Sequence, residues 1–162
     1  MLKFKKTLIV TPLILILLAA VGAGLWLGFD EQPESSLSQL EAPFSQAVRQ
    51  QAGFGLYYPA QLPPGFSFNT NSVQVSPNYV LFSFQYDGGF VVITQQPKPA
   101  VMEKLSKTKE FKTASGQAFI ADVNGKAVGF LLTDKTLVII SGIDKANADK
   151  LELLLRSFKP LD

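Results

Sequence analysis

The chain has 162 residues, of which 47% are hydrophobic and 17% charged, and its formal net charge is +2. It contains no cysteine, which excludes disulfides, thiolate nucleophiles and thiolate metal sites. It contains no histidine either, which removes the commonest general base and the commonest transition-metal ligand.

An uncharged apolar run, Thr7–Phe29, follows a short tail that carries three lysines. Its 23 residues can cross a bilayer, since about 20 apolar residues span the hydrocarbon core as a helix. The lysines predict that residues 1–6 are a cytoplasmic tail. We therefore expect a single-pass protein of the cell membrane, anchored by Thr7–Phe29, whose C-terminal domain is extracytoplasmic.

A cleaved signal peptide is the alternative for this segment. The small residues Val21, Gly22 and Ala23 resemble the sites that signal peptidase prefers, and cleavage near Ala23 would give a secreted protein. The apolar run continues past Ala23, however, and is longer than an ordinary signal-peptide core. The uncleaved signal anchor is therefore the preferred hypothesis.

The part that follows the apolar run is close to neutral. Three of the 15 basic residues precede the run, so 12 basic and 13 acidic residues follow it, a net charge of −1. Nucleic-acid-binding domains usually carry a clustered basic surface. We expect no nucleic-acid partner and leave an unknown envelope protein or polymer as the partner.

Residues 30–53 are expected to be a linker that includes a short helix. The segment begins with the polar sequence DEQPESSLSQLE, whose composition is typical of a flexible tether. Phe44 and Val48 are four residues apart, as on one face of a helix, and Gly53 is a suitable end for it.

Residues 54–160 are expected to form the extracytoplasmic domain. Three prolines after Phe54 exclude a regular helix there, and from Ser72 the apolar residues recur with the period of two that is typical of strands. The sequence LELLLRSF near the end has apolar residues at helical spacing. The predicted fold class is α+β, an antiparallel sheet of about five to seven strands in meander hairpins with a C-terminal helix on one face.

Two hairpins can be given a register from their turns. With Asp87-Gly88-Gly89 as a three-residue loop, Tyr86 would pair with Phe90 and Phe84 with Val92. The dipeptide Asn124-Gly125 is a strong signal for a type I′ turn. It predicts two pairs across the second hairpin, Phe119 with Phe130 and Ala121 with Val128.

The strand after the second hairpin extends the same meander. A turn at Asp134-Lys135 would pair Leu132 with Leu137 and Phe130 with Ile139. Apolar residues would then occupy both faces of this part of the sheet, with Leu131, Val138 and Ile140 on the opposite face. We therefore expect both faces to be covered.

The order of short motifs resembles a known bacterial family. The sequences YYP, LPPGF, VVITQQ, DVNGKAV, LVIISG and LELLLRSFK occur in this order and resemble domain-of-unknown-function family 4367 over Phe54–Lys159. The resemblance implies an extracytoplasmic domain behind a single transmembrane helix. Its motifs are structural, so it implies no catalytic residue.

Catalytic signatures are missing from the sequence. The serines do not stand in a G-x-S-x-G motif, and no pair of acids is placed for glycoside hydrolysis. We expect no enzyme, no metal and no cofactor. Core packing explains most aromatic residues, and four tyrosines remain candidates for ligand contact, namely Tyr57, Tyr58, Tyr79 and Tyr86.

The functional hypothesis is a membrane-anchored, non-catalytic binding or sensor module at the cell envelope. The alternative is a structural or assembly component of an envelope complex that acts through its transmembrane helix, Thr7–Phe29.

Overall fold

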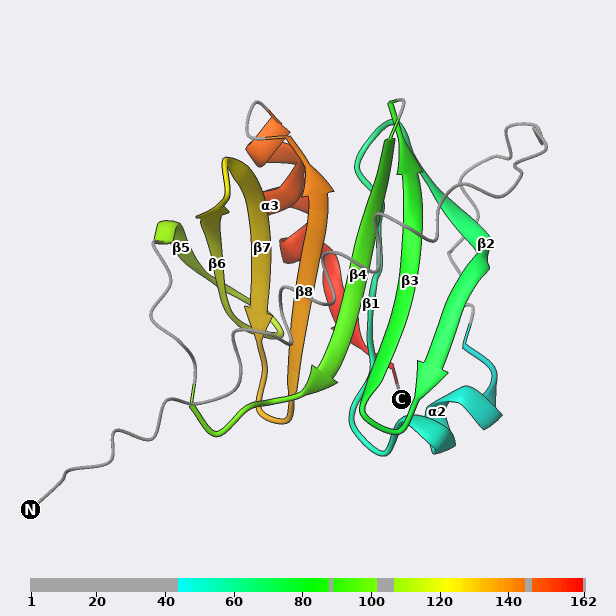
Figure 1. The fold of residues 1–162 in the computed structure, drawn as a ribbon. Helices are drawn as coiled ribbons and strands as arrows, with labels where there is room; N and C mark the ends of the chain where they lie inside the picture. The colour runs from blue at the N-terminus through cyan, green and yellow to red at the C-terminus, as the bar shows by residue number, and fades with distance from the viewer. Residues whose placement is uncertain (1–43, 88, 102–106, 145–146, 162) are drawn as a thin grey trace, which may run out of the picture. The chain divides into compact units, whose positions relative to one another are not determined.

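The computed structural model describes residues 44–87, 89–101, 107–144 and 147–161, which are coloured in Figure 1. The predicted tail, anchor and polar tether fall in residues 1–43, outside the described residues. Among the helices that are described, none has the length and apolar character needed to cross a membrane.

Seven strands form one antiparallel sheet, and two short strands pair separately. The order in the large sheet is β2-β3-β4-β8-β7-β6-β5, and β1 pairs with β9. The elements are α2 (Gln46–Ala52), β1 (Tyr57–Pro59), β2 (Phe66–Ser76), β3 (Tyr79–Tyr86), β4 (Gly89–Pro97), β5 (Lys107–Thr113), β6 (Gly116–Val123), β7 (Lys126–Leu132), β8 (Thr136–Ile143), α3 (Ala148–Ser157) and β9 (Phe158–Pro160). The predicted antiparallel sheet with a C-terminal helix is confirmed.

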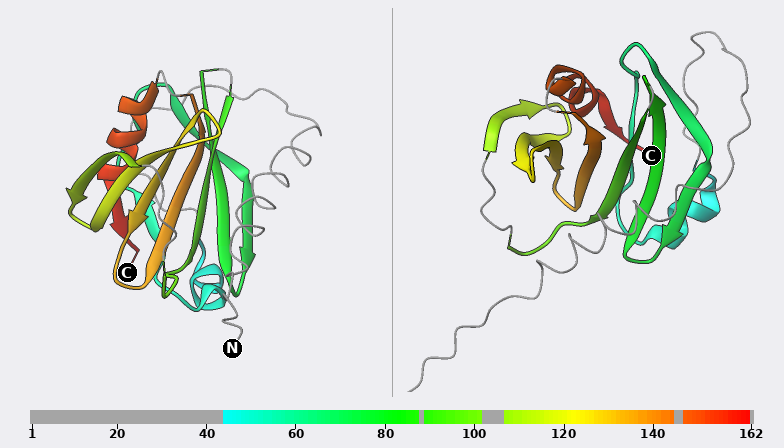
Figure 2. Two further views of the ribbon diagram at one scale, coloured as in Figure 1. Left: turned by 60° about the vertical axis from the view of Figure 1, so that its left-hand side comes forward. Right: turned by 45° about the horizontal axis from the view of Figure 1, so that its top comes forward.

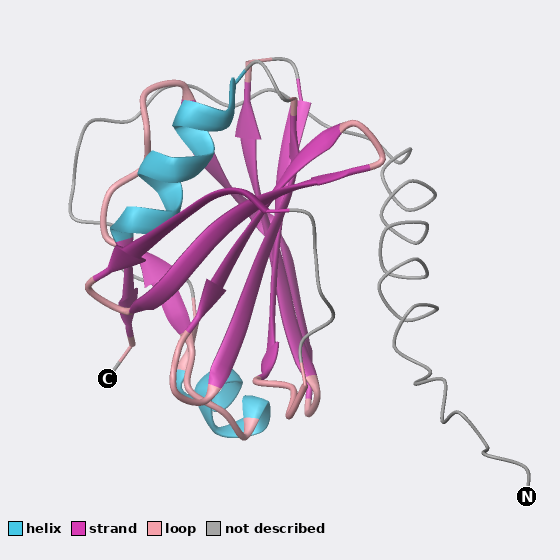
Figure 3. Cartoon of the chain, turned by 90° about the vertical axis from the view of Figure 1, so that its left-hand side faces the viewer, coloured by secondary structure: helices cyan, strands magenta, loops and turns pink. Residues whose placement is uncertain are grey.

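Helix α3 covers one face of the sheet, which we call the first face. It packs on β7, β6 and β8, and in Figure 3 it lies along one side of the strands, with the short α2 at one end of the sheet. Figure 2 shows α3 from two further sides. The buried helix residues Leu151, Leu154 and Leu155 share one core cluster with Leu131 and Ile140 of the sheet. The C-terminal helix therefore closes the main core, as its apolar stripe predicts.

The hairpin at Asn124-Gly125 has the predicted register. Phe119 pairs with Phe130, and Ala121 pairs with Val128. Both turn residues have positive φ, 54° for the asparagine and 79° for the glycine, as a type I′ turn requires. The next pairs, Phe130 with Ile139 and Leu132 with Leu137, are also confirmed.

The register predicted for the β3–β4 hairpin is wrong by one residue. Tyr86 pairs with Gly89 and Phe84 with Val91, instead of with Phe90 and Val92. The reason is that β4 begins at the second glycine of the loop, so the loop has two residues. Because side chains alternate between faces, this shift places Val91 and Ile93, rather than Val92 and Thr94, on the first face.

Apolar residues occupy both faces of the β6–β8 part, as predicted. We call the face away from α3 the second face. Its cluster contains the buried Phe119, Ala121, Val128, Phe130 and Leu137, with Val123, Leu132 and Ile139 partly buried beside them. All eight lie on β6, β7 and β8, and no other described element contributes to the cluster.

The short helix expected before Gly53 is present, but it is part of the domain rather than of a linker. Helix α2 begins after Ser45, whose hydroxyl accepts a hydrogen bond from the backbone N–H of Val48, and ends at Gly53 with φ 65°. Phe44 and Ala52 are buried in the main core cluster. The folded core therefore begins at least ten residues before the predicted start at Phe54.

We predict that Gly142 of β8 tolerates no side chain. It lies in a bulge with φ 101°, and a Cβ atom there would be 2.2 Å from the backbone oxygen of Phe90 on β4. Replacing Gly142 with alanine should lower the free energy of unfolding by about 3 kcal/mol or more, through clash and backbone strain. Urea denaturation of the full chain measures this loss.

The matched control is Gly125→Ala. Its φ is also positive, at 79°, but a Cβ atom there would have no heavy atom within 4 Å beyond its chain neighbours, so only backbone strain of about 1 kcal/mol is expected. If the two alanine variants lost the same free energy of unfolding, the close approach of β4 to Gly142 would not contribute to the effect.

Candidate functional site

Strand β1 crosses the first face and positions two of the candidate tyrosines. On one side it pairs with β9: the Leu56 carbonyl accepts a hydrogen bond from the Leu161 N–H at 2.9 Å. On its other side the fully buried amide of Gln95 bonds the backbone of Tyr57. The Tyr57 N–H donates to Gln95 Oε1 at 2.8 Å, and Gln95 Nε2 donates to the Tyr57 carbonyl at 2.6 Å.

The side chain of Tyr58 points into the main core. It is 3% exposed, and its ring centroid lies within 5.7 to 6.1 Å of four phenylalanine rings. Most of the ring pairs are edge-on or tilted, which is the favourable geometry for aromatic pairs. We call these five residues the aromatic cluster: Phe44, Tyr58, Phe68, Phe82 and Phe84.

The Tyr58 hydroxyl group is buried without a hydrogen-bond partner among the described residues. A buried polar group without a partner costs about 1–3 kcal/mol, so such groups in native proteins call for a reason. Burial also raises the pKa of the Tyr58 hydroxyl well above its usual value of 10.0. The group therefore stays protonated at neutral pH and can donate a hydrogen bond.

Tyr86 lies at the far end of β3 and has its polar group satisfied. Its hydroxyl oxygen accepts a hydrogen bond from Asn147 Nδ2 at 3.0 Å, and its ring stacks on Phe66 with centroids 4.9 Å apart. Lys150 Nζ lies 5.0 Å from the ring centroid and pairs with Asp87 at 2.8 Å. These contacts fasten the β3–β4 hairpin to α3.

The structure does not bring the four predicted tyrosines together. Tyr57 and Tyr58 are neighbours in β1, the first half-buried and the second fully buried. Tyr79 and Tyr86 are the two ends of β3, about 23 Å apart at the usual rise per residue. Tyr79, at 36% exposure, is the most accessible of the four. Ligand contact at each tyrosine stays a prediction.

Sequence reasoning missed the residues that surround Tyr58. Phe44 and Phe68 are distant in the chain from Phe82, and no local pattern connects them. The burial of Gln95 could have been predicted from the sequence if the register of the β3–β4 hairpin had been correct. With the correct register, Val91, Ile93 and Gln95 alternate on the first face, and a glutamine in that series indicates a buried amide that needs partners.

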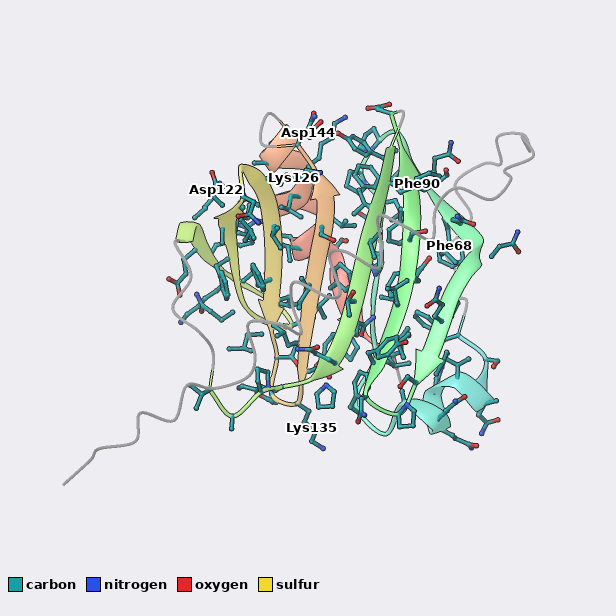
Figure 4. The ribbon with its side chains drawn as sticks, in the orientation of Figure 1. Phe68, Phe90, Asp122, Lys126, Lys135 and Asp144 are labelled. Carbon is teal, nitrogen blue, oxygen red and sulfur yellow. The ribbon has the colours of Figure 1, made fainter. Side chains whose placement is uncertain are left out.

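Acidic residues do not converge on a metal centre in the described residues. No group of three or more acids there could hold a metal ion. In Figure 4, Asp122, Lys126 and Asp144 lie at one end of the strands and Lys135 at the other, with Phe68 on β2. That no enzyme activity exists stays a prediction.

The ion pairs of α3 have a structural explanation. Glu152 pairs with Lys109 of β5 and, at 2.8 Å, with Arg156. Hydrogen bonds from Lys109 and then Arg156 hold the pKa of Glu152 below its usual value. The Arg156 guanidinium also lies 4.5 Å from the centroid of the Phe111 ring. These contacts join β5 to α3 at the surface.

No protein-family model, no curated protein and no solved structure matches this chain. Its function is therefore inferred from the residues themselves. The aromatic cluster is the best candidate for a functional site, because it holds a buried hydrogen-bond donor that the described residues leave unpaired.

We predict that Gln95→Leu destabilises the domain by about 2–3 kcal/mol, because the N–H and carbonyl of Tyr57 lose their partners. The control is Gln96→Leu, at the half-buried neighbouring position, which should change stability by less than about 0.5 kcal/mol. Urea denaturation of both variants is the measurement. A loss that is no larger for Gln95→Leu would contradict the role given to its amide.

Tyr58→Phe should remove a loss of stability at high pH. The pKa of the Tyr58 hydroxyl is higher in the folded chain than its unfolded value of 10.0. The contribution of this group to the free energy of unfolding is therefore complete below pH 10. It falls as the pH rises further, by about 1.4 kcal/mol per pH unit, because only the unfolded chain loses the proton. The difference in unfolding free energy between native chain and variant should follow this slope between pH 10 and 11.5. Tyr79→Phe is the control, and equal slopes for both variants would contradict the prediction.

Proposed function

We propose that the chain is a membrane-anchored, extracytoplasmic binding or sensor module without catalytic activity. The anchor rests on the uncharged run Thr7–Phe29 and the three lysines before it. The likeness to domain-of-unknown-function family 4367 agrees with this placement and is part of the proposal. The absence of histidine and cysteine from the sequence favours recognition over chemistry.

The observation that carries the proposal is the unpaired hydroxyl of Tyr58 inside the aromatic cluster. A catalytic hydroxyl is normally bonded to a general base that activates it. The four aromatic rings that contact the ring of Tyr58 are all phenylalanines, which cannot act as a base. A neutral donor in an apolar setting suits the recognition of a ligand, where a few polar groups fix orientation within an apolar wall.

The position of Phe44 favours a sensor over a simple binder. Phe44 directly follows the predicted polar tether in the sequence, three residues after Glu41. Its ring lies 5.8 Å from that of Tyr58 and 5.2 Å from that of Phe82. A ligand that occupied the aromatic cluster would displace Phe44, which lies three residues after the predicted tether in the sequence.

The absence of native cysteine gives a direct test of the proposed placement. Single cysteines are introduced by Asp134→Cys, in the exposed β7–β8 turn, and by Lys3→Cys, in the predicted tail. In spheroplasts of a bacterial host, a membrane-impermeant maleimide should label the turn at once and the tail only after permeabilisation. Labelling of the turn only after permeabilisation would reject the proposal. A mature chain that lacks the tail cysteine would show that the segment is cleaved.

The alternative, an assembly component that acts through Thr7–Phe29, makes a different prediction. Replacing this segment with an unrelated anchor should leave the size of the native complex in mild detergent unchanged if the domain makes the interactions. Loss of a larger complex on replacement would favour the alternative.

A further inference from the structure

The surroundings of the Tyr58 ring indicate what kind of partner its hydroxyl would take. The rings of Phe44, Phe68, Phe82 and Phe84 surround the Tyr58 ring, and none of these side chains has a conventional acceptor. A buried water normally needs two to four polar partners, so a water here would be poorly held. A partner with an apolar body and one polar atom suits the position better.

We propose that the aromatic cluster binds a small uncharged ligand, with an aromatic or short aliphatic body and one carbonyl or hydroxyl oxygen that accepts a hydrogen bond from Tyr58. The ligand takes the position of the Phe44 ring. This inference rests on the proposed binding function and names the class of ligand. A charged ligand is excluded, because no group in the cluster could pair with a buried charge.

Phe44 is the wall of the cluster that moves at least cost. Phe68 lies on β2, and Phe82 and Phe84 lie on β3, so all three are fixed by the ladder of the seven-stranded sheet. Phe44 lies two residues before the seven-residue helix α2 and does not belong to the sheet. Its backbone carbonyl accepts a hydrogen bond from Arg49 Nε at 3.3 Å. A short helix of this length depends on its packing rather than on its own hydrogen bonds.

The expected selectivity comes from one neutral hydrogen bond. Such a bond favours a ligand with an acceptor over an isosteric hydrocarbon by about fivefold. Acetophenone and ethylbenzene are suitable probes, because they have the same ring and nearly the same shape but differ in the carbonyl oxygen. Both partition into lipid, so each is compared at equal free concentration.

The experiment uses the full chain in lipid nanodiscs, labelled with 3-fluorotyrosine and observed by fluorine NMR. The Tyr58 resonance is assigned from its loss in Tyr58→Phe. Acetophenone should shift this resonance saturably, at about fivefold lower concentration than ethylbenzene. Phe44→Ala should lower the saturating concentration of both probes about tenfold, because the ligand no longer displaces a ring, and Phe44→Leu should lower it less.

Two controls separate this site from hydrophobic binding elsewhere. Phe130→Ala opens an equivalent space on the second face without a hydroxyl, and should leave the Tyr58 response unchanged. In Tyr58→Phe, followed at the neighbouring Tyr57 resonance, the preference for acetophenone should disappear.

The inference is overturned if neither probe shifts the Tyr58 resonance, whether in the native chain or in Phe44→Ala. It is equally overturned if the two probes saturate the shift at the same concentration. It is also overturned if the preference survives in Tyr58→Phe. Failure here with correct maleimide labelling in spheroplasts rejects the ligand class and leaves the anchored module. Failure of the labelling rejects the anchored module whatever the probes do.

Discussion

Two hydrogen bonds between the buried amide of Gln95 and the backbone of Tyr57 hold the aromatic cluster in place. Strand β1 has only three residues, and its partner β9 lies on one side of it. The amide supplies on the other side what a further strand would supply, a donor and an acceptor at the right spacing. Together with the Thr136 hydroxyl, which donates a hydrogen bond to the Gly55 carbonyl, the amide fixes the depth at which Tyr58 enters the first face.

Because of this amide, the register of the β3–β4 hairpin also determines where β1 lies. Pairing Phe84 with Val91 places Gln95 on the first face, opposite Val80 and under β1. Pairing Phe84 with Val92 would place Gln95 on the second face and leave Tyr57 without partners. The register of a hairpin and the position of a strand distant in sequence are thus fixed by the same residue.

The parts of the fold that could be predicted are those set by local chemistry. Asn124-Gly125 fixes its hairpin because both residues accept positive φ, so one loop length is favoured. Asp87-Gly88-Gly89 allows loops of two or three residues with similar local cost, and burial of distant groups makes the choice. The aromatic cluster joins segments from residue 44 to residue 84, and alternation within one strand contains no information on such contacts.

The pairing of β1 with β9 has a consequence for the order in which the domain is assembled. Tyr58 pairs with Lys159, so the second strand of the two-stranded sheet is synthesised about 100 residues after the first. Contacts between residues so far apart in sequence form late, because their loop-closure entropy must be overcome first. The β2–β4 meander can fold before β9 has been made, but the strand that carries Tyr58 has no strand partner until β9 is synthesised. Loss of β9 would therefore damage the region around Tyr58, at the opposite end of the domain's sequence.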